Sequence, residues 1–530
     1  MAFRKIRLHL LPVLAAAGCA LLLSSCGGGG SAPAQTSTAP TTPTSPTVPA
    51  TPGAYADSIA YSSLATASLA APNENSAVIA AHITLAGKEF DYTVTSGHLT
   101  ATDAVTGKPS ASFFYVAYTA PSSNGAARPL TFFYNGGPGS SSMWLHLGSF
   151  GPRRLVSTIP SSTITPAQLV DNQETLLPTT DMVFVDAIGT GYSEAIAPNT
   201  NQTFWGVDSD AAAFRDFVQR YISVNQRQAS AKLLYGESYG TPRTAVLANL
   251  LETAGVDISA VVLQSTILNY NANCGVLNPG TTSCEGYVPT YAATGAYYQR
   301  STPLPTDFSA YVQQARAFSI SDYRTAMSSF LTLKTPPPAA VVAQLFADTG
   351  IPTLTWQQNF DLGPDTFQTT LLPGQLIGRY DARVSAPAGS ALTVDGDPSL
   401  TVVNAAFTSG IASYLSAELH YSAQSAYVAD NSDTINRWNF SHDGLSLPDT
   451  VPDLAAALTQ HPGMKILSLN GYHDLATPFH QTELDLARLG SEPGLQFKYY
   501  SSGHMIYLDD AARKLQQADL IAFYGSITGL

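Results

Sequence analysis

The sequence predicts an α/β fold in which a mostly parallel sheet carries helices on both faces. Short apolar runs typical of buried strands alternate with stretches of helical periodicity between residues 129 and 264. The alternation stops there and resumes at residue 465. Several predicted strands run directly into short motifs of glycine and polar residues. With 530 residues, the chain is long enough for one large domain with insertions, or for two domains.

The composition is that of a globular protein with a sizeable core. Hydrophobic residues make up 45% of the chain and charged residues 12%. The net charge of −13 argues against binding to nucleic acid or to an anionic membrane surface through a basic patch. We therefore expect a small or peptide-like ligand.

The N-terminus has the pattern of a processing signal. Basic residues at Arg4, Lys5 and Arg7 precede an apolar stretch, Leu8–Leu23, that is too short for a stable transmembrane helix. The sequence LSSC ending at Cys26 resembles a bacterial lipobox, which implies cleavage before Cys26 and lipid attachment to its thiol. A plain secretory signal is the alternative. We expect an exported protein anchored in the bacterial cell envelope, or a periplasmic or secreted one if it is not lipidated.

Residues 27–53 consist almost entirely of Gly, Ser, Thr, Pro and Ala. Such a segment buries too little apolar surface to offset its ordering entropy, so we expect a disordered tether. The folded domain is then expected over residues 54–530, attached to a membrane only through the lipid anchor.

A lead-in sheet of hairpins is expected before residue 120. Three runs rich in β-forming residues, with glycines between them as turn signals, predict its strands. The runs are His82–Leu85, Phe90–Thr95 and Phe113–Thr119, and the glycines are Gly87, Gly97 and Gly107.

A glycine-rich loop, Asn135–Ser142, follows the predicted strand Pro129–Tyr134. Such a loop exposes backbone N–H groups and lets a ligand approach the main chain. Phosphate binding is disfavoured, because the loop lacks the Lys-Ser or Lys-Thr of a P-loop and the acidic ribose ligand of a dinucleotide site. An oxyanion hole is the better interpretation.

The central motif is Gly236-Glu237-Ser238-Tyr239-Gly240. It lies between an apolar run ending at Tyr235 and a helical pattern over Thr241–Leu251, which is the strand-turn-helix context of a nucleophile elbow. The alternative is an ordinary loop serine. We predict Ser238 as the nucleophile, with the backbone N–H groups of Tyr239 and Gly137 as the oxyanion hole.

Further alternation completes this part of the sheet. Met182–Ile188 and Ala260–Leu263 are predicted strands, and Asp208–Tyr221 is a predicted helix. From about residue 269 to about residue 449 the alternation is lost, and we expect a helical cap inserted over the active site.

Two cysteines, Cys274 and Cys284, lie within this insertion. In an oxidising compartment they most simply form one disulfide that closes a short loop. Metal binding is the minority interpretation, because no histidine is close enough in sequence to complete a ligand set.

The last two predicted strands end in polar residues suited to catalysis. Lys465–Leu469 leads to Asp474, and Gln496–Tyr500 leads to His504. The order serine, acid, histidine, with each residue after a strand, is that of the α/β-hydrolase fold. We predict a triad in which His504 is the base and Asp474 orients it.

Three residues compete for these roles. His473 and His480 are alternatives to His504, although neither follows the terminal strand. Asp186 also ends a strand, but it precedes the serine, and its loop suggests a structural turn lining the cleft.

Four blocks of sequence together resemble the serine carboxypeptidase family, peptidase family S10. They are NGGPGSSS at 135–142, DAIGTGYS at 186–193, GESYG at 236–240, and the pair GYHDLATP and GHMIY within 471–507. The resemblance extends from about residue 80 to the C-terminus, and its details look closer to the exported bacterial branch.

The resemblance implies removal of the C-terminal residue of a peptide, best at acidic pH, without a cofactor or metal. Asn135 and Glu237 match residues that bind the α-carboxylate of the substrate in this family. Glu237 can do so only by sharing a proton with the substrate, because two carboxylates cannot both ionise cheaply in a dry site. A second glutamate of the family is replaced by Ser149, and the usual cysteine after NGGPG is Ser140.

The expected function is therefore an exported serine carboxypeptidase that forms an acyl-enzyme with a peptide substrate. An esterase or acyltransferase on the same scaffold is the first alternative, because Ser149 weakens the carboxylate clamp. A catalytically silent surface-binding protein is the second.

Overall fold

The computed structural model describes residues 53–122, 125–277 and 281–528. The expected signal segment, Cys26 and residues 27–52 of the expected tether lie outside the described residues. Gly53 exchanges two backbone hydrogen bonds with Val78, of 2.8 and 3.0 Å. No helix in the described ranges is long and apolar enough to span a bilayer.

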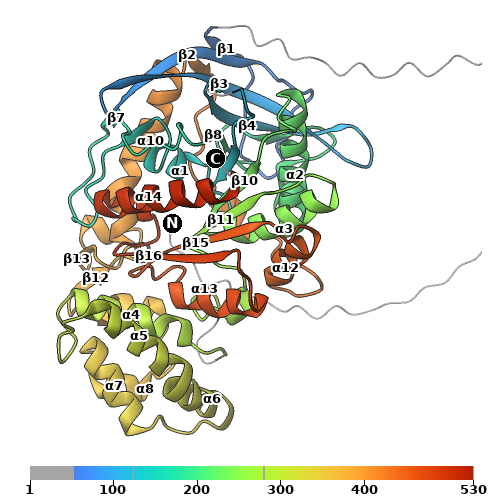
Figure 1. The fold of residues 1–530 in the computed structure, drawn as a ribbon. Coiled ribbons are helices and arrows are strands. Elements are labelled where there is room, and N and C mark those ends of the chain that lie inside the picture. Colours follow the sequence, from blue (N-terminus) through green and yellow to red (C-terminus); the bar gives the residue numbers. More distant parts are fainter. Residues whose placement is uncertain (1–52, 123–124, 278–280, 529–530) are drawn as a thin grey trace, which may run out of the picture.

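A single large sheet organises the molecule (Figure 1). Within the described residues it has ten strands, in the order β16-β15-β11-β10-β5-β8-β4-β3-β2, with β9 paired to β4. Neighbouring strands from β16 to β8 are parallel, whereas β8, β4, β3 and β2 are antiparallel. The strands are β2 (Ser76–Leu85), β3 (Lys88–Thr102), β4 (Pro109–Thr119), β5 (Leu130–Tyr134), β8 (Asp181–Val185), β9 (Glu194–Ala195), β10 (Lys232–Glu237), β11 (Ala260–Gln264), β15 (Lys465–Gly471) and β16 (Leu495–Tyr500).

Successive residues of the central strands point to opposite faces and enter two different cores. Phe132 and Leu234 belong to the core under α2 (Val207–Val224), α3 (Gly240–Thr253) and α12 (Val451–Gln460). Their neighbours Phe133 and Tyr235 belong to the core under α1 (Met143–Gly148), α10 (Pro398–Ala417) and α14 (Asp510–Thr528). Because both faces are covered, β5, β10 and β11 are buried throughout, and most of their residues are apolar. This arrangement is the α/β-hydrolase fold that the sequence predicted.

The chain between β11 and β15 is mainly helical. Its first helices surround a separate core that contains Trp356, and they form the lobe at the bottom of Figure 1. They are α4 (Val288–Tyr297), α5 (Phe308–Phe318), α6 (Arg324–Leu333), α7 (Ala339–Thr349), α8 (Thr353–Gln358) and α9 (Pro364–Thr370). The later helix α10 returns to the central sheet, and β14 (Tyr421–Ala423) pairs with the N-terminal strand β1 (Tyr55–Asp57).

The lead-in strands form the expected hairpins, but the interpretation of Gly97 as a turn is wrong. Gly97 lies in the middle of β3, where it pairs with Ser76 and Tyr115. A Cβ at this position would collide with the backbone oxygen of Asn75 and lie 2.6 Å from the Ser76 Cα. Glycine is therefore needed for the close approach of two chain segments within a strand, which a sequence pattern does not distinguish from a turn.

Candidate active site

The turn that carries Ser238 is strained and tightly packed. Ser238 has φ +60°, a left-handed conformation that is rare for residues other than glycine. A Cβ on Gly236 would collide with the carbonyl oxygen of Gly240, so the turn requires glycine there. Ser238 is half-buried, while Glu237 and Tyr239 on either side are buried. Of these three residues, only Ser238 is therefore partly exposed to solvent.

The glycine-rich loop after β5 lies directly against this turn. A Cβ on Gly136 would collide with the backbone nitrogen of Tyr239 and lie 2.8 Å from that of Gly240. Gly137 has φ +106°, which other residues rarely adopt. The two predicted oxyanion donors, Gly137 and Tyr239, thus belong to backbone segments in direct contact, as a shared oxyanion hole requires.

His504 and Asp474 form a buried hydrogen-bonded pair. The distance from His504 Nδ1 to Asp474 Oδ2 is 2.8 Å, and the two side chains are 3% and 1% exposed. The other carboxylate oxygen, Oδ1, accepts from the backbone N–H groups of Ala476 and Thr477. Burial disfavours the charged imidazolium, but the carboxylates of Asp474 and Glu237 outweigh it and raise the pKa of His504 above 6.5.

The backbone of His504 is held by two residues from other segments. Its carbonyl accepts a 2.5 Å hydrogen bond from Ser265 Oγ, and its N–H donates to the carbonyl of Tyr380 at 2.6 Å. The Tyr380 ring packs on the imidazole with centroids 4.7 Å apart. The backbone N–H of Ser238 donates to the carbonyl of Gln264, the residue before Ser265. The end of β11 therefore contacts both the serine turn and the histidine loop.

Glu237 is a buried carboxyl group held by two amides. Its Oε1 accepts from Asn135 Nδ2 at 3.1 Å, and its Oε2 accepts from Gln264 Nε2 at 2.8 Å. Burial raises the pKa of Glu237 to about 7, against the opposing effect of the nearby His504. Near neutral pH the group can therefore exist as a neutral acid or as a carboxylate.

The two departures from the family pattern have clear structural positions. Ser149 is fully buried, and its Oγ donates to the carbonyl of Leu145 at 2.5 Å. Ser140 Oγ donates to Asp430 Oδ1 at 2.5 Å. Ser149 therefore uses its hydroxyl within its own turn of chain, and Ser140 joins the glycine-rich loop to the chain before β15.

That junction also involves the backbone on both sides of Ser140. The N–H of Ser141 donates to the carbonyl of Ala429, and the N–H of Asn431 donates to the carbonyl of Gly139, at 2.8 and 2.7 Å. Residues 429–431, here called the loop brace, thus bind the glycine-rich loop along three consecutive residues.

The three competing residues lie in other environments. Asp186 accepts from the backbone N–H of Ser142 and from the Tyr427 hydroxyl, both at 2.8 Å, and burial raises its pKa to about 7. His480 Nδ1 bonds Glu483 at 2.6 Å. Burial lowers the pKa of His473 well below its usual value. Asp186 therefore anchors the end of the glycine-rich loop, and neither histidine takes the place of His504 beside Asp474.

A disulfide joins Cys274 and Cys284, with Cα atoms 5.2 Å apart. Both cysteines are buried in the core of the helical lobe, where Tyr287 packs with them. The bond ties the start of the lobe to that core.

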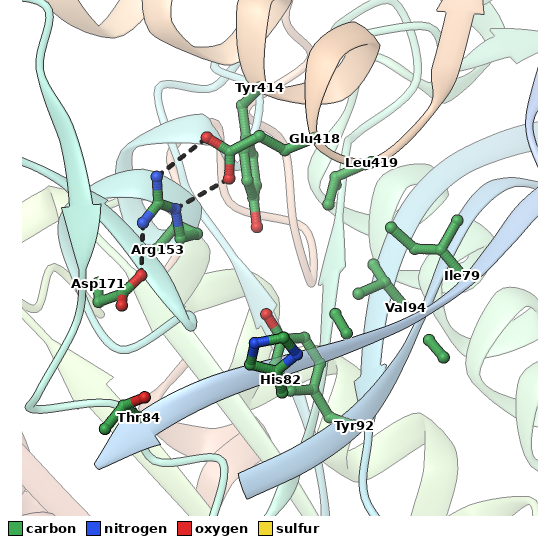
Figure 2. A pocket seen from close by; sticks show the side chains of 12 residues that line it. Ile79, His82, Thr84, Tyr92, Val94, Arg153, Asp171, Tyr414, Glu418 and Leu419 are labelled. Atoms are coloured by element: carbon green, nitrogen blue, oxygen red, sulfur yellow. Dashed lines mark hydrogen bonds and ion pairs between the residues drawn. The ribbon is translucent and has the colours of Figure 1, made fainter. Parts of the chain in front are cut away.

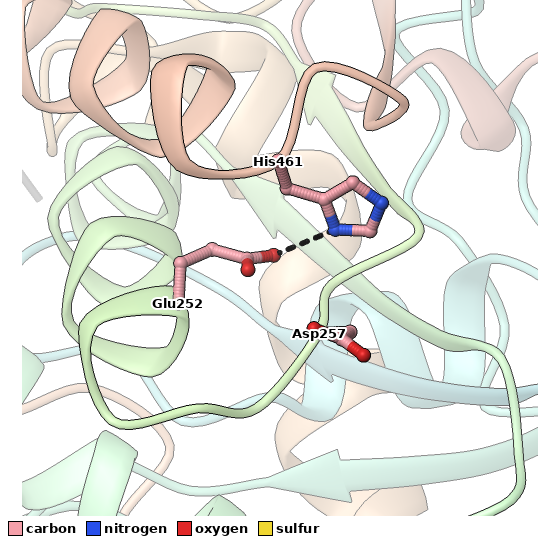
Figure 3. A group of neighbouring side chains, drawn as sticks. All are labelled: Glu252, Asp257 and His461. Atoms are coloured by element: carbon pink, nitrogen blue, oxygen red, sulfur yellow. Dashed lines mark hydrogen bonds and ion pairs between the residues drawn. The ribbon is translucent and has the colours of Figure 1, made fainter.

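Two groups in the described part of the chain have side chains close enough to share a metal ion. Figure 3 shows the first, in which His461 Nδ1 faces Glu252 Oε1 at 3.1 Å and Asp257 lies beside them. Glu252 lies near the end of α3, Asp257 precedes β11, and His461 precedes β15. The group therefore lies at the amino-terminal edge of the sheet, opposite Ser238.

The second group surrounds His442. Its Nε2 lies 2.8 Å from Asp453 and 3.6 Å from Asp443, and its Nδ1 lies 2.6 Å from Asp208. Hydrogen bonds to Asp453 and Asp208 raise the pKa of His442 to about 9 in spite of burial. An imidazolium between carboxylates accounts for this arrangement.

A separate cavity of about 400 Å³ lies on the antiparallel side of the sheet (Figure 2). Its one arginine, Arg153, donates to both oxygens of Glu418 at 2.9 and 3.0 Å and to Asp171 at 2.5 Å. The cation is already neutralised, and the cavity is lined from β2 and β3, several strands away from β10.

Three residues near the site were not predicted from the sequence. Thr477 Oγ1 donates to Asp474 Oδ2 at 2.7 Å and lies 3.1 Å from His504 Nδ1. Gln264 donates a hydrogen bond to Glu237, and the Tyr380 ring packs on His504. Thr477 could have been found from its place three residues after the acid, where a side-chain turn is common. Gln264 and Tyr380 carry no local signal.

Comparisons with known proteins agree with the resemblance seen in the sequence. Residues 86–268 match the sequence model of the serine carboxypeptidase family. This segment contains the glycine-rich loop and the Ser238 turn. A search of curated protein sequences found no significant match.

Several solved structures align with most of the chain at low identity. A proline iminopeptidase from Mycobacterium smegmatis has 12% identity and a TM-score of 0.36, covering 81% of this chain and 98% of its own. A lipase in an open form has 12% identity and a TM-score of 0.36, covering 82% and 99%. A juvenile hormone epoxide hydrolase from the silkworm Bombyx mori has 12% identity and a TM-score of 0.32, covering 82% and 79%. The family match thus confirms the resemblance over its own segment: the chain has the α/β-hydrolase fold and carries a serine carboxypeptidase family segment at residues 86–268.

Proposed function

We propose that this protein is a serine carboxypeptidase. The observation that carries the proposal is the Ser238 turn, with φ +60° and a half-buried serine between buried neighbours, at the same sheet edge as the His504–Asp474 pair. Strain of this kind persists only where the surrounding structure enforces it, and it is typical of catalytic turns.

In the proposed reaction, Ser238 attacks the carbonyl carbon of the last peptide bond. His504 takes the hydroxyl proton and then gives it to the leaving amine, while Asp474 stabilises the imidazolium. The N–H groups of Gly137 and Tyr239 bind the oxyanion of the tetrahedral intermediate. Water, activated by the same histidine, then hydrolyses the acyl-enzyme.

Selectivity for the end of a peptide is assigned to Asn135 and Glu237. The Asn135 amide would donate to the substrate α-carboxylate, and Glu237 would share a proton with it. The pKa of Glu237, about 7, supports this role, because burial keeps its carboxyl group protonated in mildly acidic solution. Turnover of peptides with a free α-carboxylate is therefore expected to fall as the pH rises through about 7.

An esterase or acyltransferase is the second candidate, and Ser149 favours it. Its buried hydroxyl is used by the Leu145 carbonyl, so it adds nothing to a carboxylate clamp. With one carboxyl group in place of the two found in the family, discrimination against substrates without a free carboxylate is expected to be weaker.

One assay separates the two candidates. An N-blocked dipeptide, its C-terminal amide and the matching alkyl ester would be compared by kcat/KM at pH 5.5. A preference of at least about tenfold for the free acid over the amide supports the carboxypeptidase, because one charge-assisted contact is worth about that much. Equal turnover of all three would support the second candidate. A third candidate, a silent binding protein, requires that a fluorophosphonate fail to label Ser238.

We also propose that the protein is exported and carries a lipid on Cys26, as the lipobox implies. Metabolic labelling with palmitate would test this against a Cys26→Ser variant. Label on the wild-type chain alone supports the anchor, and an unlabelled chain recovered in the soluble periplasmic fraction contradicts it.

A further inference from the structure

A guanidinium group is buried directly beneath the catalytic turn. Arg243 lies in the first turn of α3 and its side chain is fully buried. Its Nε donates to Asp210 Oδ2 at 2.6 Å, and one terminal nitrogen reaches Asp210 Oδ1 at 3.3 Å. Asp210, from α2, is also buried.

The remaining terminal nitrogen of Arg243 donates to the carbonyl of Asn135 at 2.7 Å. This carbonyl belongs to the peptide that leads into Gly136 and Gly137. The central carbon of the guanidinium lies over the ring of Tyr239, 5.4 Å from its centroid, and also over the rings of Phe214 and Tyr134, at 4.5 and 5.4 Å. One side chain therefore contacts both segments that supply the predicted oxyanion donors.

This arrangement is costly as a source of stability. Removing two charges from water costs several kcal/mol per ion, and their attraction often does no more than offset this cost. In some proteins a buried ion pair is retained because it fixes one geometry among several. Here the fixed geometry is that of the Asn135 peptide relative to Tyr239.

We propose that Arg243, held by Asp210, is a positioning residue that sets the spacing of the two oxyanion donors, Gly137 and Tyr239. The inference rests on the proposed serine-hydrolase chemistry. Arg243 does not touch the substrate, and it acts through the Asn135 carbonyl and the Tyr239 ring. A Lys at this position keeps the charge beside Asp210 but lacks the planar fork that reaches both partners.

The chain contains a matched control at the other end of the same strand. Arg227 pairs with Asp181 at 2.7 Å and donates to the carbonyl of Arg128 at 2.9 Å, just before β5 begins. Arg243 makes the same kinds of contact just after β5 ends, with its side chain fully buried where that of Arg227 is 15% exposed. Arg227→Lys therefore repeats the chemical change at the edge of the sheet that faces away from Ser238.

The experiment compares Arg243→Lys and Asp210→Asn with Arg227→Lys and the wild type. Each protein is assayed for the second-order rate of labelling by a fluorophosphonate, for kcat and KM on a small ester, and for thermal unfolding. Neither probe has a carboxylate, so loss of substrate binding at Asn135 does not enter. We expect the labelling rate and kcat of Arg243→Lys to fall about 10- to 100-fold, less than for complete loss of an oxyanion donor. KM should change by less than about threefold, since ground-state binding is retained.

The results of these measurements support or contradict the positioning role of Arg243 as follows. Arg227→Lys is expected to label at the wild-type rate even if its melting temperature falls. If Arg243→Lys and Asp210→Asn also label at that rate, with only a lower melting temperature, the positioning role is wrong and the pair is structural. If Arg243→Lys does not fold, Asp210→Asn, which keeps the arginine, gives the answer alone. If the wild type is not labelled, the serine-hydrolase chemistry fails first and this inference with it.

Discussion

Two histidine–carboxylate pairs of similar geometry lie at opposite edges of the same sheet. His504 and Asp474 are 2.8 Å apart at the carboxyl-terminal edge, and His461 and Glu252 are 3.1 Å apart at the amino-terminal edge (Figure 3). The first pair is almost completely buried, whereas His461 is 30% exposed. The first is tied through the end of β11 to the strained turn that carries Ser238, and the second flanks ordinary helix and strand ends. Residue type and distance alone therefore do not distinguish a catalytic pair, whereas its position relative to Ser238 does.

The most severe test of this comparison removes the nucleophile. Ser238→Ala should lower kcat by about 10⁶-fold, as for a serine hydrolase whose triad acts as a unit. Hydrolysis of an activated ester and fluorophosphonate labelling would measure it. Fluorophosphonate incorporation at another serine, with activity kept, would place the chemistry elsewhere in the molecule.

The next test concerns the buried pair itself. Asp474→Asn keeps the shape of the site but removes the charge that stabilises the imidazolium, so kcat should fall about 10⁴-fold. Because Asp474 is among the groups that raise the pKa of His504, the rising limb of the kcat profile should also move to lower pH. A variant with wild-type kcat would show that the pair has no more catalytic importance than the pair at the other edge.

A third prediction uses the carboxyl group next to Ser238. Raising the pH through about 7 ionises Glu237, and the substrate carboxylate is then repelled, so kcat/KM should fall about tenfold per pH unit above this value. Glu237→Gln has no such ionisation. The variant should be about 10-fold slower than the wild type at pH 5 but close to it at pH 8.

The same substitution also removes one of the charges that raise the pKa of His504. The rising limb of the pH profile of Glu237→Gln should therefore lie at lower pH than that of the wild type. A kcat/KM profile with the same falling limb in both proteins would exclude Glu237 as the titrating group. Asn135→Ala serves as the comparison: it should keep a falling limb but move it to higher pH, because the Asn135 amide bonds the Glu237 carboxylate and lowers the pKa of Glu237.

The smallest effect is expected at the amino-terminal edge. Glu252→Gln keeps an acceptor for the backbone N–H of Ile258 and removes the charge beside His461. The change lies away from Ser238, so kcat/KM should stay within about twofold of the wild type at every pH. A tenfold loss of kcat/KM in a Glu252→Gln protein that melts at the wild-type temperature would contradict the functional distinction between the two edges of the sheet.

The sequence predicted the elements around Ser238 well because each has a local signal. The strand before the turn is Lys232–Glu237 and the helix after it begins at Gly240, as the apolar run and the following periodicity indicated. Asp474 and His504 follow β15 and β16, and order along the chain was enough to single them out from His473 and His480. Their hydrogen bond follows from the parallel pairing of these two strands.

Contacts between distant segments could not be predicted in this way. Arg243 appears in the sequence as one polar position of a helix, and nothing nearby identifies Asp210 or the Asn135 carbonyl as its partners. Tyr380 lies in the insertion, where the alternation of strands and helices is lost. Gly97 shows the opposite error, because a residue that permits turns also permits close packing inside a strand.

The loop brace has a consequence for how the protein is made. Ser140 and Asp430 are 290 residues apart in the chain, and the brace is synthesised long after the loop that it binds. The proposed base, His504, is translated later still. A nascent chain can therefore complete most of its central sheet while its glycine-rich loop has no brace and its serine no base. The proposed peptidase would thus stay inert toward other polypeptides near the ribosome until almost the entire chain has emerged.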